Sequence, residues 1–114
     1  MKTSTLTGAD LNRAVAMALG HKFFPKPDST EQYVKASGQP YLLANYSGEI
    51  TAAWPIIVSK RIDLRHTRRF STWSARIDRA SVEQPPATAR DADAIVAAMR
   101  CFVASVYGDD VEMP

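Results

Sequence analysis

The spacing of apolar residues changes twice along this chain, and that change constrains the fold more than any other feature. Within residues 8–19 apolar side chains recur at the spacing of one helical face. Residues 54–64 and 72–78 alternate between apolar and polar side chains, as strands do. Helical spacing then returns over 89–107. Helices at both ends with strands between them predict an α+β fold.

Both predicted helices carry signals for their ends. A capping box precedes each of them, formed by Thr7 with Asp10 and by Thr88 with Asp91. Gly20 and Gly108 follow the last periodic residues, where a glycine commonly ends a helix. These signals set the expected helices at 8–19 and 89–107.

The two predicted strands suit an antiparallel hairpin, because only the short basic link at 65–70 separates them. Pro55 has no N–H donor, which places it at the start of a strand or on an edge. We expect the terminal helices to pack on a small antiparallel sheet that contains this basic hairpin. Residues 21–45 show no lasting period and predict a variable region, and 109–114 predict a frayed acidic tail.

Length and composition suit one globular domain over 1–114, since 46% of the residues are apolar and 23% are charged. Cys101 is the only cysteine, which excludes an intrachain disulfide and fits a reducing compartment. Asp10 and Arg13 interrupt any apolar signal-peptide region, and no apolar stretch is long enough to span a membrane. We expect a protein of the cytoplasm that makes no membrane contact.

The last predicted helix has no properly polar side. Ile95 and Phe102 belong to a wide apolar face, whereas the reverse face is small rather than charged, with Ala97 and Ala104. A helix of this kind is usually covered on both sides. Either the first helix or a second subunit covers it, and we expect a homodimer or a higher homo-oligomer.

Positive charge is concentrated in residues 60–79, which hold seven Lys or Arg residues but only two Asp residues. Guanidinium groups bind phosphate and carboxylate oxygens through parallel donors, so clustered arginines favour an anionic ligand. A nearby tryptophan offers a surface for stacking a base. The predicted ligand-binding residues are Arg61, Arg65, Arg68, Arg69, Arg76, Trp54 and Arg100. Two alternatives remain open: an edge hairpin protected by its arginines, and a structural ion pair at Arg100.

The sequence offers no recognisable catalytic or metal site. His21 and His66 are the only histidines, and Cys101 lies among alanines of the last helix, which does not favour a nucleophile–base pair. Two separate histidines and one cysteine do not supply clustered metal ligands, and no glycine-rich phosphate loop is present. We therefore expect a protein that is not an enzyme and has no catalytic residues, metal or cofactor.

Several segments share motifs with one known family. They are Trp54–Ile57 followed by Arg61 and Ile62, then Trp73–Arg76, and finally Ala97–Ser105 with Gly108 and Asp109. In this order they resemble the W/G-P-I-I signature, the W-x-A strand and the C-terminal helix and tail of the NinX-like proteins of phages and prophages. The chain departs from that pattern where Glu49 and Ile50 replace Asp-Trp. The resemblance implies a phage accessory protein, and it transfers no catalytic residue.

Three functional hypotheses follow from the arginines and this resemblance. In the first, a phage accessory protein for host takeover or counter-defence binds or sequesters an anionic ligand, such as a nucleotide-derived signal, in the bacterial cytoplasm. In the second, a protein–protein inhibitor module sets its arginines against an acidic surface of a host defence complex. The third, direct nucleic-acid binding, is disfavoured because the acidic last third of the chain does not extend the basic stripe.

Overall fold

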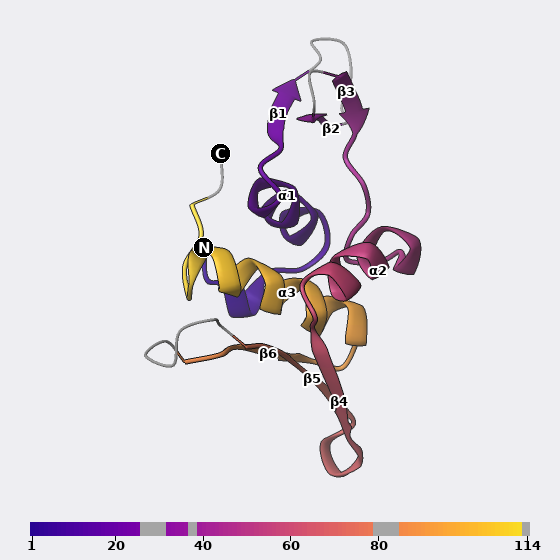
Figure 1. The fold of residues 1–114 in the computed structure, drawn as a ribbon, viewed down its shortest axis with the longest axis vertical. Helices are drawn as coiled ribbons and strands as arrows, with labels where there is room; N and C mark the ends of the chain where they lie inside the picture. Colours follow the sequence, from indigo (N-terminus) through magenta and orange to yellow (C-terminus); the bar gives the residue numbers. More distant parts are fainter. Residues whose placement is uncertain (26–31, 37–38, 79–84, 113–114) are drawn as a thin grey trace.

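The computed structural model describes residues 1–25, 32–36, 39–78 and 85–112, which form three α-helices and two antiparallel sheets (Figure 1). The helices are α1 (Gly8–Ala18), α2 (Ile50–Ser59) and α3 (Ala94–Tyr107). One sheet contains β1 (Lys22–Pro25), β2 (Gln32–Ala36) and β3 (Gln39–Leu42), and the other contains β4 (Asp63–Thr67), β5 (Thr72–Ile77) and β6 (Ala87–Asp91). The short 3-10 helix η1 (Thr3–Thr5) precedes α1, and a second one, η2 (Arg68–Phe70), connects β4 to β5. The predicted α+β fold with a helix at each end is confirmed.

Helix α3 lies at the centre of the core. The β4–β6 sheet packs on one side of it and α1 on the other, and α2 and η1 also contact it (Figure 1). On its small-residue face Ala97, Ala98 and Cys101 are 0% exposed. The chain itself therefore buries both sides of α3, so the lack of a polar side no longer argues for a second subunit.

Helix α1 closely matches the predicted range of 8–19. Thr7 occupies the N-cap position, but its side chain makes no capping hydrogen bond. The Asn12 side chain accepts a hydrogen bond from the Ser47 N–H at 2.8 Å and donates one to Asn45 Oδ1 at 3.1 Å. These bonds fix α1 to the segment that leads into α2.

The prediction of a strand over 54–64 is wrong for its first part, which belongs to helix α2. The buried residues Ala53, Ile56 and Ile57 have helical spacing, and Pro55 lies inside the helix. Consecutive branched apolar residues fit both periods over a short run, and contact with α3 here selects the helix. The strand begins only at β4, which pairs antiparallel with β5.

The last helix begins at the start of α3 and not at 89 as predicted. Thr88 lies on β6, which pairs antiparallel with β5, so it caps no helix. The N-cap is Asp93, whose carboxylate accepts hydrogen bonds from the N–H groups of Ile95 and Val96 at 2.8 and 3.3 Å. The sequence prediction took Thr88 with Asp91 as the capping box, whereas the cap is the later Asp93.

The region 21–45, expected to be variable, contains the β1–β3 sheet, although its residues 26–31 and 37–38 lie outside the described residues. Its prolines Pro25 and Pro40 fall on the two edge strands, where a missing N–H donor is tolerated. A strand pattern broken by such residues is difficult to recognise from sequence.

The two chain ends pair with each other. Lys2 and Asp110 form an antiparallel bridge, and the Val111 N–H donates to the Met1 carbonyl oxygen at 2.9 Å. Val111 is 1% exposed, so the apolar side chain anchors the end of the chain in the core. The tail over 109–114 was expected to fray, and it is instead paired at its start; its last two residues lie outside the described part.

Candidate functional site

The β4–β6 sheet has one face on α3 and a second face that no described helix covers (Figure 1). Leu64, Ala75 and Ala89 pack toward the core. Because side chains alternate along a strand, their neighbours lie on the other face. We call it the outer face, and its residues are Asp63, Arg65, Thr67, Thr72, Ser74, Arg76, Thr88 and Arg90. Every one of these side chains is polar.

The strand register places Arg65, Ser74 and Arg90 in one row across the outer face. Strand β5 is the middle strand, so Ser74 is flanked by one arginine on each side. Neighbouring strands lie about 4.8 Å apart, which puts the two arginine Cα atoms about 10 Å from each other. Two side chains of this length can therefore converge on one ligand above the Ser74 hydroxyl. We call these three residues the Arg–Ser–Arg row.

Two hollows lie along the outer face and share Ser74 and Arg90. The first has a volume of about 390 Å³ and is lined by Asp63, Arg65, Ser74, Ala75, Arg76, Asp78, Thr88, Ala89 and Arg90. The second has about 400 Å³ and is lined by Thr67, Phe70, Thr72, Ser74 and Arg90. Because the two hollows meet at the Arg–Ser–Arg row, we treat them as one outer groove. Its volume lies in the range typical of small-molecule sites, about 300–1,000 Å³.

The arginines of the outer groove differ in whether their charge is balanced. Arg76 Nε donates to Asp78 Oδ1 at 2.8 Å, and Asp63 is its direct neighbour across the strands. Arg65 and Arg90 are exposed and form no ion pair with any residue that the structure describes. These two guanidinium groups are therefore the ones available to an external anion.

The residues predicted to bind a ligand do not form one cluster. Arg65 and Arg76 lie on the outer face, Arg68 and Arg69 in η2, Trp54 on α2, Arg61 after that helix, and Arg100 on α3. Neither Trp54 nor Arg61 lines the outer groove. The sequence prediction missed Arg90, because it assigned this residue to the last helix. The alternation of small and polar residues over 87–91 was the available signal, and it is a short one.

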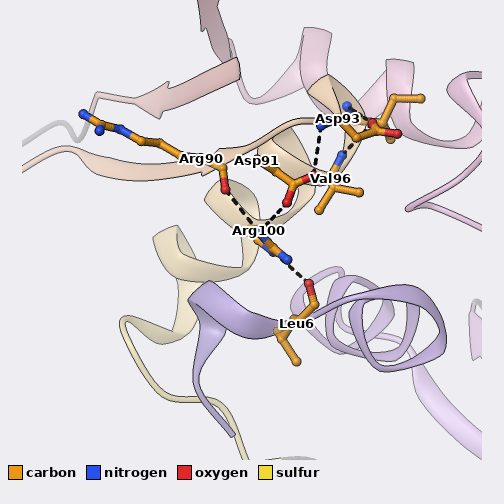
Figure 2. Close-up of polar contacts among 7 residues, drawn as sticks. Leu6, Arg90, Asp91, Asp93, Val96 and Arg100 are labelled. Carbon is orange, nitrogen blue, oxygen red and sulfur yellow. Dashed lines mark hydrogen bonds and ion pairs between the residues drawn. The ribbon is translucent and has the colours of Figure 1, made fainter. Parts of the chain in front are cut away.

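Arg100 connects three segments of the core (Figure 2). Only 7% of it is exposed, and its Nε donates to the Leu6 carbonyl oxygen at 2.7 Å. Its Nη1 donates to the Arg90 carbonyl oxygen at 3.1 Å and to Asp91 Oδ1 at 3.0 Å. The arginine thus ties the segment before α1 to β6 and α3. It also holds the backbone of Arg90, whose side chain points to the opposite side of the sheet.

Other reactive groups are separate from the outer groove. Cys101 is fully buried and its thiol donates to the Ala87 carbonyl oxygen at 3.3 Å. Burial raises the pKa of the Cys101 thiol to about 11, so it is protonated at neutral pH. Within the described ranges, no group of three His, Cys, Asp or Glu residues is placed to hold a metal ion. No helix found in those ranges is long and apolar enough to cross a membrane.

A third hollow, of about 370 Å³, lies between η1, β6 and the end of α3. Its lining includes the basic residues Lys2 and Arg100, but also the acidic residues Asp109 and Asp110. Arg100 is already bound to Asp91. The mixed charge makes this hollow less suited to an anion than the outer groove.

Comparison with known protein families identifies a match over most of the chain. Residues 2–106 match the protein family described as Bacteriophage P22, NinX. The match spans the β4–β6 sheet and therefore includes the whole Arg–Ser–Arg row. No curated protein sequence matches the chain significantly.

Proposed function

The chain belongs to the Bacteriophage P22 NinX family, and from this premise we propose that it is a phage accessory protein that binds an anionic ligand in the outer groove. The Arg–Ser–Arg row carries the proposal. Two arginines without ion pairs among the described residues flank a hydroxyl on an open, wholly polar sheet face. Packing of the core does not require this arrangement, because the row faces away from α3.

The row favours a phosphate as the group it contacts. Guanidinium groups bind phosphate oxygens through parallel N–H donors, and two of them on opposite sides cover more than one oxygen. Ser74 adds a hydroxyl donor between them. One arginine can bind both oxygens of a carboxylate, so a carboxylate ligand does not require two arginines. A phosphate exposes three oxygens, which the two arginines and the serine of the row can contact together.

The rest of the outer groove extends the ligand beyond a phosphate. Phe70 lines the second hollow at one end of the groove, is 70% exposed, and has the Arg69 guanidinium 5.4 Å from the centre of its ring. Bases stack on such aromatic side chains, which contributes about 1–3 kcal/mol per base. We therefore propose a nucleotide or a nucleotide-derived signal as the ligand. The protein would sequester this signal without converting it, and in a phage that activity would serve counter-defence.

Isothermal titration with ATP as the probe tests the proposal. Arg65→Gln with Arg90→Gln removes the two charges of the row. Arg61→Gln with Arg68→Gln is the control pair, because it removes the same charge from exposed residues that do not line the outer groove. Hydrogen bonds to charged groups contribute about 1.5–3 kcal/mol, and about 1.4 kcal/mol corresponds to tenfold in Kd. We expect the row variant to bind about a hundredfold more weakly and the Arg61 and Arg68 control variant to change by less than about threefold.

The folding of both variants is checked by urea denaturation, where exposed substitutions shift the free energy of unfolding by only about 0.5 kcal/mol. Equal weakening by both pairs would show an effect of net charge alone and would contradict the proposal. A wild-type protein that binds no phosphate ester, but binds an acidic partner protein, would contradict it as well.

A further inference from the structure

Helix α2 exposes an apolar surface that the outer groove does not use. Ile50, Trp54 and Val58 are 50%, 56% and 56% exposed, and their spacing of four residues places them on one side of the helix. We call these three residues the α2 stripe. The helix contains no charged residue from Ile50 to Ser59, although a surface helix ordinarily turns charged residues to water. Helix α2 therefore buries one apolar face in the core and exposes a second apolar surface, the stripe, to solvent.

Opposite charges stand at the two ends of the α2 stripe. Glu49 is the N-cap residue of α2; it is exposed and its side chain makes no capping hydrogen bond. Arg61 follows the helix and is exposed too. Neither residue forms an ion pair with another part of the chain that the structure describes. The surface therefore runs from an unpaired negative charge through an apolar centre to an unpaired positive charge.

We infer that the α2 stripe is the contact of a symmetric homodimer in which α2 packs antiparallel on α2 of a second copy. Trp54 is midway between Ile50 and Val58, so a two-fold axis at Trp54 brings each Ile50 onto Val58 of the partner subunit. The same axis brings each Glu49 toward Arg61 of the partner subunit. A parallel arrangement would instead place like charges together. The surface is self-complementary only in the antiparallel arrangement.

The size of the α2 stripe sets the strength of this dimer. The ten residues of α2 span about 15 Å. A stable interface buries about 1,200–2,000 Å² in total, and three side chains from each copy supply only part of that area. We therefore expect a dimer that dissociates on dilution. The inference is independent of ligand binding, since none of these residues lines the outer groove.

Sedimentation equilibrium of the full chain tests the dimer. The weight-average mass of the wild type should rise from 12.5 kDa toward twice that value with concentration. Val58→Glu should keep the protein monomeric, because it places a charge in the stripe. Val106→Glu is the matched control: Val106 is also a helical valine, 49% exposed, but lies on α3, and this variant should dimerise like the wild type.

Charge reversal tests the antiparallel geometry. Glu49→Arg and Arg61→Glu should each weaken the dimer by about threefold or more, and the double variant should restore it, because each reversed residue again meets an opposite charge. A wild type that stays monomeric at the highest concentration would overturn the inference. So would a Val58→Glu variant that dimerises like the wild type, or a double reversal no stronger than the single ones.

Discussion

Replacing Arg100 with alanine should destabilise this fold more than the loss of any exposed arginine. The guanidinium lies in the core and makes one ion pair and two hydrogen bonds to carbonyl oxygens, which belong to Leu6 and Arg90. Its removal leaves the Asp91 carboxylate, whose side chain is only 29% exposed, without its cation. Both carbonyl groups lose their charged donor at the same time.

The magnitude follows from these contacts. Breaking a buried ion pair by removing one partner costs about 3–5 kcal/mol. Asp91 retains some access to water, so we take the lower end and expect a loss of about 3 kcal/mol in the free energy of unfolding. A domain of this size has about 5–15 kcal/mol in total. The variant should therefore still fold, with a clearly lower urea midpoint.

Urea denaturation followed by far-UV circular dichroism measures this loss. Arg68→Ala is the control, because Arg68 is exposed in η2 and should shift the free energy of unfolding by about 0.5 kcal/mol at most. A double-mutant cycle with Asp91→Ala should give a coupling energy of about 1 kcal/mol or more. A loss below about 1 kcal/mol for Arg100→Ala would refute the assignment of Arg100 as a structural anchor.

Three further outcomes are expected. Asp93→Ala removes the side-chain cap of α3 and should lower the free energy of unfolding by about 1 kcal/mol, whereas an unchanged melting curve would exclude that role. Ala97→Arg should unfold the chain, as seen by circular dichroism, because Ala97 is buried within the chain itself; a folded variant would contradict the burial of Ala97 in the core. Cys101 should resist thiol reagents until the protein unfolds. Its pKa is raised from 9.0 to about 11, so its contribution to stability is complete below pH 9 and is lost as the pH rises toward 11. Cys101→Ala should lack that loss.

Strong local signals made part of this fold predictable. Helix α1 follows a polar N-cap position, and Gly108 with a positive φ of 80° ends α3. Strand β5 alternates as expected, with Ala75 buried and Arg76 exposed. In each of these cases the local pattern and the tertiary environment favour the same structure.

The failures arose where tertiary contacts chose between two local patterns. Apolar residues such as Ile56 and Ile57 fit a strand or a helix equally, and packing on α3 decides for the helix. Thr88 and Asp91 have the spacing of a capping box, but pairing with β5 places both residues in β6, and the N-cap of α3 is Asp93. The same pairing places Arg90 in a strand, which the local pattern did not predict.

The outer groove is tested most directly as the ligand site by mapping the NMR shifts of the backbone amides and the arginine Nε groups during titration with ATP. We expect the largest changes at Arg65, Ser74 and Arg90, together with the Phe70 amide at the end of the outer groove. Arg68 and Trp54 should shift little. A map with no saturable change, or with its largest changes away from the β4–β6 sheet, would contradict the assignment of the outer groove as the ligand site.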